Sequence, residues 1–370
     1  MRVLMTGITG TGKKSYAKAV RAACAQRGVT VEIIHFEEVM EACDVTGTFR
    51  TDTMYHHSRA LLQLLCAQTL EEVQRRTAEA ERQGARHVIL DMHATYLWDH
   101  VPFSIASVAQ IAKTFNPDLV VSLLDDTHEL YHALKKRTDA ASARFLADGS
   151  PLVDLLNWRM HEITIAEQIA FAAHRYDAVR KLSLPGFFLL SCAGGPSLLV
   201  QLLCESRYAC MVTHPKRVVY ASFAISVLKE QSGDGEHLRV AKRNAKEAIN
   251  RFRTQLKEQF IVLDPYTITE KLLADAYANS APDGVVLMVC RDTTTLTIPR
   301  DLVAPAVPLI EGQIVDRDER LVRSAESVVI YLPVLPGQDM PAPSEGAAFE
   351  RIAARLHGRD TVLITEASRE

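Results

Sequence analysis

A glycine-rich segment near the start of the chain, residues 7–15, has the sequence GITGTGKKS. Its glycines allow backbone N–H groups to surround a polyphosphate, the helix that follows directs its positive end at the anion, and a lysine can reach the β- and γ-phosphates. The residues expected to hold the nucleotide are Gly7, Gly10, Gly12, Lys13, Lys14 and Ser15, with Lys13 as the catalytic cation. The pattern predicts a site for a nucleoside triphosphate, with ATP as the expected ligand. A glycine-rich turn that only caps a helix is the alternative.

A magnesium ion is expected beside this segment. The common form of the pattern has Ser or Thr directly after the lysine, where the hydroxyl holds Mg²⁺. Here that residue is Lys14, so Ser15, the next hydroxyl, is the expected ligand. A second ligand is expected from Asp91, which ends the apolar run 87–91. Such a run is typical of a buried parallel strand whose carboxyl end lies at the ligand-binding edge of the sheet, although this arrangement is common in α/β proteins.

The order of apolar runs predicts the elements that hold these groups. Strands are expected at residues 3–5, 29–34, 87–91 and 187–191, with helices at about 13–26 and 57–83. After about residue 206 the alternation starts again, with strands at 216–223, 260–264, 285–289, 328–333 and 361–364 and a long helix at about 236–259. This alternation predicts an α/β protein with parallel sheets. We expect two domains, residues 1–206 with helices on both faces of a sheet and residues 207–370 as a smaller flavodoxin-like or Rossmann-like sandwich.

Several stretches of the first 200 residues resemble the archaeal-type adenylate kinases. Residues 91–95, DMHAT, are similar to the D-x-H-A stretch of that family, and residues 116–121, NPDLVV, are similar to the stretch that follows it. The resemblance implies phosphoryl transfer from a nucleoside triphosphate to a small acceptor, with positioning and charge neutralisation as the catalytic effects. It implies that His93 contacts the acceptor, that residues 52–57 lie near it, and that Arg137 and Arg159 neutralise the migrating group. For His93 the alternative is a hydrogen-bonded polar residue of the loop, and for the paired histidines 56 and 57 it is a position on the surface. Further candidates for that role are Lys135, Lys136 and Arg144, and a solvated charged helix face is the alternative for each of these cations.

The last part of the chain, roughly residues 216–366, resembles the nucleoside 2-deoxyribosyltransferase family. The similarity lies in the order of the segment 316–322, an apolar strand at 328–333 and the segment 344–350, SEGAAFE. The resemblance implies that Glu350 is the nucleophile, that Tyr220 orients it, that Asp318 serves the leaving base and that Gly346 is the loop glycine. Ser344 stands where the family has an aspartate that contacts the sugar hydroxyls. A carboxylate beneath C1 can form a covalent glycosyl-enzyme, whereas an acid in the first turn of a helix is the alternative for Glu350.

Composition narrows the possible partners. The formal net charge is −3, so no overall basic field indicates nucleic-acid binding, and the expected ligands are small nucleosides and nucleotides. The seven cysteines form no C-x-x-C pair, and we identify no histidines at metal-ligand spacing, which favours a reducing compartment and argues against structural zinc. No apolar stretch reaches the length of a membrane span and no signal peptide is recognised, so a cytoplasmic location is expected. A homo-oligomer is implied by the transferase resemblance alone.

Together these features predict a fused enzyme of nucleotide metabolism. One domain would transfer a phosphoryl group from ATP, and the other would cleave or exchange a nucleoside N-glycosidic bond. The alternative is a nucleotide-driven switch, in which slow ATP hydrolysis controls a nucleotide-degrading glycosidase domain.

Overall fold

The computed structural model describes residues 1–50, 57–98, 100–137, 140–147, 149–176, 186–209, 212–223, 235–267, 271–282, 284–334 and 344–365. The chain forms two compact units. The first unit consists of Met1–Cys204 and Thr267–Val315, and the second of Glu205–Tyr266 and Asp316–Glu370. The expected division after residue 206 therefore differs from the structure, because residues 267–315 belong to the first unit.

The first unit is built on a five-stranded parallel sheet with the strand order β2-β3-β1-β6-β7. The strands are β1 (Arg2–Thr6), β2 (Val31–His35), β3 (His87–Asp91), β6 (Leu119–Leu124) and β7 (Phe187–Ser191). Every residue of β3, β6 and β7 is buried. Strands that are covered on both faces consist of continuous apolar runs, which is why β3 and β7 were recognisable in the sequence, whereas residues 116–121 had been singled out only through the family resemblance. The prediction of an α/β protein with parallel sheets flanked by helices is confirmed.

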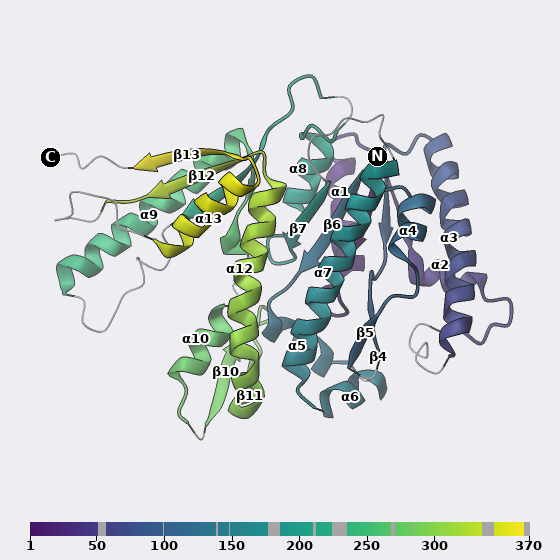
Figure 1. Ribbon diagram of the computed structural model, residues 1–370, viewed down its shortest axis with the longest axis horizontal. Coiled ribbons are helices and arrows are strands. Elements are labelled where there is room, and N and C mark those ends of the chain that lie inside the picture. Colours follow the sequence, from purple (N-terminus) through teal and green to yellow (C-terminus); the bar gives the residue numbers. More distant parts are fainter. Residues whose placement is uncertain are drawn as a thin grey trace. The chain divides into compact units, whose positions relative to one another are not determined.

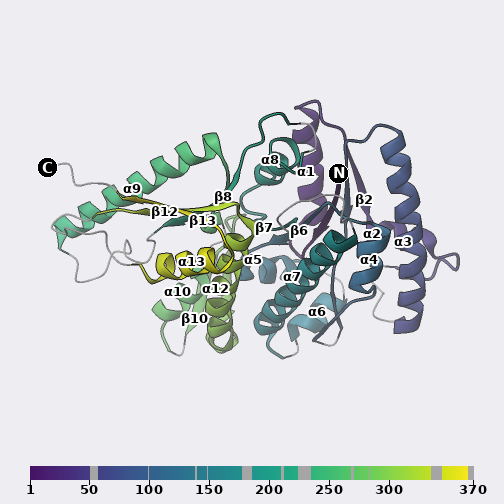
Figure 2. The ribbon, with the colours of Figure 1, turned by 45° about the horizontal axis from the view of Figure 1, so that its top comes forward.

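Eight helices of the first unit precede residue 205 in the described part of the chain. They are α1 (Lys13–Ala25), α2 (Phe36–Cys43), α3 (Arg59–Arg82), α4 (Val108–Thr114), α5 (Thr127–Lys135), α6 (Ala140–Ala147), α7 (Pro151–Tyr176) and α8 (Ser197–Cys204). A short antiparallel hairpin, β4 (Tyr96–Trp98) and β5 (Val101–Phe103), follows β3. Helices α1 and α8 pack together on one side of the sheet, and α7 lies on the other (Figures 1 and 2). The glycine-rich segment thus connects β1 to α1.

Residues 267–315 add a subdomain to the first unit. It follows the short helix η3 (Pro265–Thr267) and contains α10 (Lys271–Asn279), β10 (Val285–Val289), β11 (Thr295–Pro299), α11 (Arg300–Val303), η4 (Ala304–Ala306) and the start of α12 (Val307–Ser324). The prediction that residues 285–289 belong to a second parallel core was wrong, because β10 pairs with β11 in an antiparallel hairpin. Along β10 buried and exposed residues alternate, as expected for a hairpin with one covered face.

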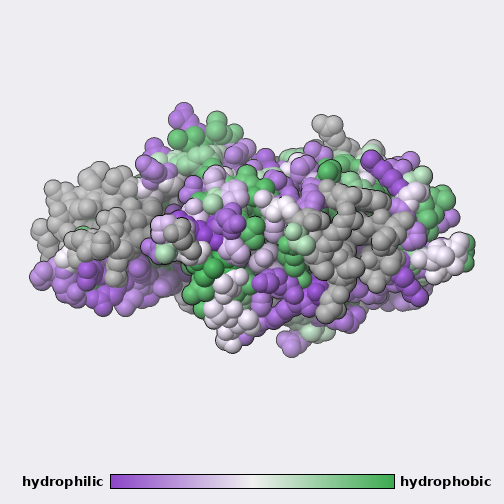
Figure 3. Space-filling model, turned by 90° about the horizontal axis from the view of Figure 1, so that it is seen from below, coloured by the Kyte–Doolittle hydropathy of each residue, from purple (hydrophilic) through white to green (hydrophobic). Residues whose placement is uncertain are grey.

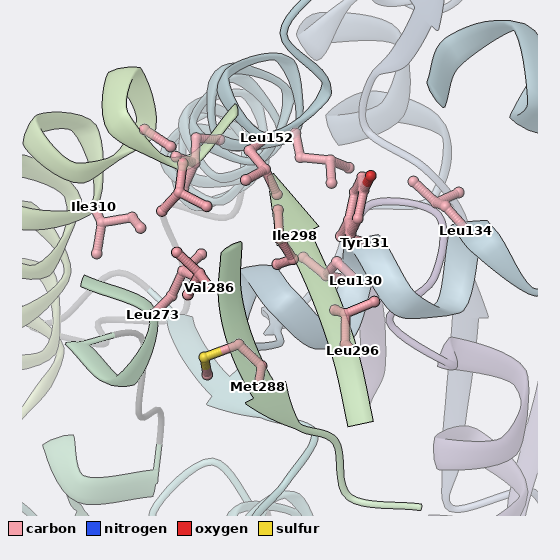
Figure 4. Packing of buried hydrophobic residues seen from close by; sticks show 14 of the residues in the cluster. Leu130, Tyr131, Leu134, Leu152, Leu273, Val286, Met288, Leu296, Ile298 and Ile310 are labelled. Atoms are coloured by element: carbon pink, nitrogen blue, oxygen red, sulfur yellow. The ribbon is translucent and has the colours of Figure 1, made fainter. Parts of the chain in front are cut away.

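The covered face of this hairpin packs against α5, α7 and α12. The side chains that meet there are shown in Figure 4 and include Leu130, Leu134, Leu152, Val286, Met288, Leu296, Ile298 and Ile310. Because these residues come from segments more than 100 residues apart in the sequence, the local pattern at 285–289 could not show which core the strand joins.

The second unit contains a four-stranded parallel sheet with the order β13-β12-β8-β9. Its strands are β8 (Val218–Phe223), β9 (Ile261–Leu263), β12 (Ser327–Leu332) and β13 (Asp360–Thr365). Helix α9 (Glu236–Gln259) covers one side of the sheet and α13 (Glu345–Leu356) the other (Figure 2). On the α9 side, Ala245, Ile249 and Leu256 pack against Val219 and Val329. Alternate residues of β8, Tyr220 and Ser222, therefore face α13.

The surface carries both hydrophilic and hydrophobic side chains. Hydrophilic and hydrophobic residues are interspersed on the face drawn in Figure 3. Among the described helices, none combines the length and the apolarity that crossing a bilayer requires.

Candidate functional site

The glycine-rich turn has a backbone that only glycine adopts easily. Gly7, Gly10 and Gly12 have φ values of 146°, 97° and 71°. A Cβ atom on Gly7 would lie 2.9 Å from the carbonyl oxygen of Leu123, so a side chain has no room there. Gly12 is the N-cap of α1, whose first turn contains no acidic residue. The positive end of this helix is therefore open to an anion without competition from a carboxylate in its own first turn.

Lys13 folds back over this turn. Its ammonium Nζ donates a hydrogen bond to the carbonyl oxygen of Gly7 at 2.7 Å and lies 3.1 Å from Nε2 of His93. Burial of the imidazole, together with the charges of Lys13 and Arg137, holds the pKa of His93 well below its usual value. A neutral imidazole can accept a hydrogen bond from the ammonium. The structure thus brings three expected residues, Lys13, His93 and Arg137, into one electrostatic environment.

A buried glutamate that we did not predict organises the same region. Glu162 on α7 accepts hydrogen bonds from the backbone N–H groups of Gly7 (2.9 Å), Ala94 (2.9 Å) and Thr95 (2.6 Å), and from the Thr95 hydroxyl (2.7 Å). Burial raises the pKa of Glu162, and these hydrogen bonds and the charge of Lys13 oppose that shift. The carboxylate joins the glycine-rich turn to the loop after β3, which carries His93.

Two further carboxyl groups, those of Asp91 and Glu37, interact with each other in this region. Asp91 is buried at the end of β3, and its Oδ2 atom accepts a hydrogen bond from Nδ1 of His35 at 2.8 Å. Its Oδ1 atom is buried without a hydrogen-bond partner among the described residues. Glu37, also buried, accepts a hydrogen bond from the hydroxyl of Tyr96 at 3.1 Å. Burial raises the pKa of Glu37; the charge of Lys13 opposes this shift and that of Asp91 adds to it.

These groups are compatible with Mg²⁺, which prefers hard oxygen ligands. The partnerless Oδ1 of Asp91 is the strongest indication, because a buried carboxylate oxygen normally has a donor or a cation beside it. Ser15 is a weaker indication of a metal site. It is exposed on α1, and its hydroxyl already donates a hydrogen bond to the carbonyl oxygen of Gly12 at 2.7 Å. Lys14 pairs instead with Glu38 at 2.8 Å, and this hydrogen bond raises the pKa of Lys14.

The arginines expected to neutralise a phosphoryl group differ in their surroundings. Arg159 is buried, and its guanidinium bonds to Oε1 of Gln313 at 3.0 and 2.5 Å and to the carbonyl oxygen of Asp125 at 3.3 Å. This geometry indicates a structural tether between α7 and α12 within the first unit. Arg137, in contrast, is exposed. The side chain of Arg144 and the segment 52–56 lie outside the described residues.

The second unit brings together the three residues that the transferase resemblance implies. Tyr220 donates a hydrogen bond to Oε1 of Glu350 at 2.5 Å. The charge of Asp318 raises the pKa of both Glu350 and Tyr220, so all three groups interact. Tyr220 lies on β8, Asp318 inside α12 and Glu350 on α13. Tyr220 is about 100 residues or more away from the other two in the sequence, so it is the fold that makes it their neighbour.

Glu350 is not an acid of the first helical turn. Helix α13 begins at Glu345, which occupies that position, and Glu350 follows in the second turn with its side chain buried. Burial raises the pKa of Glu350 from 4.5 to about 7, and the charge of Asp318 adds to the shift. Hydrogen bonds from Ser222 and Tyr220 oppose it, as does the charge of Arg317. A carboxyl group in this environment changes its protonation state near neutral pH.

Two neighbours of Glu350 were not predicted. The Ser222 hydroxyl donates a hydrogen bond to Oε2 of Glu350. Arg317 is buried and bonds through Nε (3.1 Å) and Nη2 (3.0 Å) to Oδ1 of Asp318. Ser222 could have been identified from its spacing, since residues two apart on a strand share a face and Tyr220 was already assigned. Arg317 directly precedes Asp318, but nothing in the sequence distinguishes it from the other arginines of α12.

The remaining two residues of this set have modest roles in the structure. Ser344 is the N-cap of α13, where its hydroxyl accepts a hydrogen bond from the backbone N–H of Ala347 at 3.3 Å. A Cβ atom on Gly346 would meet only the hydroxyl of Ser344, at 3.8 Å, so no close contact requires glycine there. Their proposed contacts with a sugar stay predictions.

Comparison with known proteins does not identify the chain. The sequence matches no protein-family model, and it has no match among curated proteins. The chemistry of the two sites is therefore the basis on which a function is proposed below.

Proposed function

We propose that the protein is an enzyme of nucleotide metabolism that binds ATP in its first unit and cleaves or exchanges a nucleoside N-glycosidic bond in its second. The single observation that supports this best is the environment of Glu350, a buried carboxyl group that accepts hydrogen bonds from Tyr220 and Ser222 beside the charge of Asp318. The proposal adopts the reaction class implied by the deoxyribosyltransferase resemblance.

The glycosidic step uses the ionised form of Glu350. One carboxylate oxygen attacks C1 of the sugar, the C1–N bond breaks, and its electron pair leaves with the base. Asp318 orients the departing base, which gains a proton from water. In the second step, water or another base attacks C1 and releases the carboxylate. The donors Tyr220 and Ser222 keep the carboxylate oriented throughout.

The first unit contributes the nucleotide site. Backbone N–H groups of the segment 7–15 and the ammonium of Lys13 bind the phosphates, while Glu162 holds the turn in position. Asp91 and Ser15 would hold Mg²⁺, which would neutralise phosphate charge. We assign His93 and Arg137, whose charges and those of Lys13 interact, to the binding of an acceptor, so transfer to a nucleoside or nucleotide is the proposed reaction.

The experiment compares base release by the purified protein and by its Glu350→Ala variant. A panel of nucleosides and nucleotides is incubated with protein, with and without ATP and Mg²⁺, and free bases and new phosphates are measured by mass spectrometry. Glu345→Ala is the matched control, because Glu345 is an exposed acid on the same helix. Base release that disappears only in Glu350→Ala supports the proposal, whereas release that persists in that variant contradicts it.

One observation favours a second function for the first unit. Arg159 is committed to Gln313 and to the carbonyl oxygen of Asp125, which leaves fewer guanidinium groups to stabilise a transferred phosphoryl group. A nucleotide-driven switch needs only slow hydrolysis, which tolerates this deficit. The same incubation separates the two functions. New phosphorylated acceptors indicate a kinase, whereas inorganic phosphate without a phosphorylated acceptor, coupled to base release, indicates a switch.

A further inference from the structure

Helix α5 carries two histidines at a spacing typical of metal ligands. His128 and His132 are four residues apart in the sequence HELYH, so they lie on one face of the helix. The same spacing, H-E-x-x-H, binds zinc on helices in other proteins. The expectation that no histidines lie at metal-ligand spacing was therefore wrong for this helix.

A cysteine and an aspartate lie beside one of these histidines. One ligand atom each from His132, Cys290 and Asp292 can be chosen so that all three lie within 4.8 Å of one another. Nε2 of His132 is 3.0 Å from Oδ2 of Asp292. His132 and Cys290 are buried, whereas Asp292 is exposed. Nitrogen, sulfur and oxygen donors thus meet at a point that a cation can reach from solvent.

The protein holds these donors in place from both sides. Cys290 and Asp292 belong to the tight turn between β10 and β11, where the backbone N–H of Cys290 donates to the carbonyl oxygen of Thr294 at 2.9 Å. The other carboxylate oxygen of Asp292, Oδ1, accepts from the backbone N–H of Thr294 at 3.0 Å, which leaves Oδ2 directed at His132. The apolar contacts between α5 and the hairpin fix the spacing of the two elements (Figure 4).

A positive charge already lies beside this cluster. The ammonium of Lys136 contacts Oδ2 of Asp292, the carboxylate oxygen that is directed at His132. His128, one turn earlier on the same helix, is buried and its Nδ1 atom has no hydrogen-bond partner among the described residues, but the three donors that lie together are those of His132, Cys290 and Asp292.

We propose that His132, Cys290 and Asp292 bind a divalent transition metal ion, with Zn²⁺ as the best match. Imidazole, thiolate and carboxylate are its usual ligands, and the mixed donor set disfavours Mg²⁺ and Ca²⁺. On binding, the Cys290 thiol loses its proton to solvent and the ion displaces the ammonium of Lys136 from Asp292. The ion would join the hairpin β10–β11 to α5 within the first unit, independently of the proposed nucleotide and sugar sites.

The test uses Co²⁺ as a spectroscopic probe on the full-length, chelator-treated protein. Cobalt bound through a thiolate gives a sulfur-to-metal charge-transfer absorption that non-thiolate sites lack. We expect this absorption to saturate at one equivalent and to disappear when Zn²⁺ is added. Cys290→Ser should abolish it, while Cys43→Ser, a change at a half-buried cysteine on α2, should leave it intact.

Two variants of exposed residues keep the test decisive if the buried cysteine cannot be replaced without unfolding. Asp292→Asn should weaken Zn²⁺ binding by more than about tenfold, the lower end of the loss seen when even an outer partner of a metal site is removed. Lys136→Met should strengthen binding, because it removes the competing cation. A network that only stabilises the fold would bind no metal in any variant. Absence of the charge-transfer absorption, or its persistence in Cys290→Ser, overturns the proposal.

Discussion

Two buried glutamates, one in each unit, show how differently the same side chain can be used. Glu162 accepts four hydrogen bonds, three of them from backbone N–H groups, of which one belongs to the glycine-rich turn and two to the loop after β3. Glu350 accepts hydrogen bonds from the hydroxyl groups of Tyr220 and Ser222 and lies beside the charge of Asp318. Donors from the backbone fix a carboxylate as part of the architecture. Glu350 is held instead by side chains that leave it close to its ionisation point at neutral pH.

Burial alone does not identify a catalytic acid. Burial raises the pKa of both groups. What separates them is the neighbourhood, because Glu162 is tied to main-chain atoms and Glu350 lies in a cluster of ionisable and hydroxyl groups. Perturbed groups in such clusters are candidates for chemistry, whereas fully bonded ones stabilise loops.

The largest expected effect is the loss of base release when Glu350 is replaced. Replacing Glu350 with Gln should reduce the rate by a factor on the order of a thousand or more, because the amide cannot act as a nucleophile. Glu345→Gln should leave the rate unchanged. The rate is measured by chromatography of the released base under single-turnover conditions. A Glu350→Gln variant that retains more than a few per cent of the activity would show that the carboxylate is not the nucleophile.

Replacement of Glu162, in contrast, should lower the stability of the folded protein. Glu162→Ala leaves buried N–H groups of Gly7, Ala94 and Thr95 without an acceptor, which should lower the free energy of unfolding by roughly 3 kcal/mol. Glu162→Gln keeps one carbonyl acceptor and should cost less. Urea unfolding followed by circular dichroism measures both variants. Equal stability of Glu162→Ala and the parent protein would remove the architectural role assigned to this residue.

The stability of the parent protein should depend on pH in a way that the stability of the Glu350→Gln variant does not. The pKa of Glu350 rises from 4.5 to about 7 on folding, so between these values the folded protein binds more protons than the unfolded chain. This group therefore makes the protein less stable as pH rises from 4.5 through 7, by roughly 3 kcal/mol in total. The difference in unfolding free energy between Glu350→Gln and the parent should grow over that interval and then level off. A difference that does not vary with pH would contradict the environment described for Glu350.

The smallest expected effect concerns the partner that orients the nucleophile. Tyr220→Phe removes one hydrogen bond to Glu350 and should slow base release by about tenfold, while the midpoint of its pH profile moves upward because a donor to the ionised form is lost. Initial rates are measured between pH 5 and 9. If the profile does not move, Tyr220 acts through packing rather than through its hydroxyl.

Some of these features could be predicted from the sequence. The apolar runs at β1, β3 and β7 predicted a parallel sheet, and the glycines at 7, 10 and 12 predicted a turn that other residues adopt with difficulty. The neighbours Tyr220, Asp318 and Glu350 were predicted from a resemblance in the order of segments. In each case the signal lies within a short stretch of chain.

Other features depend on contacts that a short stretch does not contain. Glu162 is recognisable only as an acid on the apolar face of α7 that includes Trp158, because its partners are backbone atoms and carry no residue identity. Cys290 and Asp292 meet His132 across about 160 residues of sequence, through a hairpin that had been assigned to the other domain. Such pairings follow from tertiary packing, which the local periodicity of the sequence does not reveal.

The most direct test of the account is to look for the covalent intermediate on Glu350. The protein is mixed with a nucleoside substrate, quenched in acid within milliseconds to seconds, and analysed by intact-protein and peptide mass spectrometry. We expect a fraction of the protein to carry the mass of the sugar residue on the peptide that contains Glu350, and no adduct in Glu350→Gln. Base release that proceeds without any sugar adduct at Glu350, or with an adduct on another residue, would show that Glu350 is not the nucleophile.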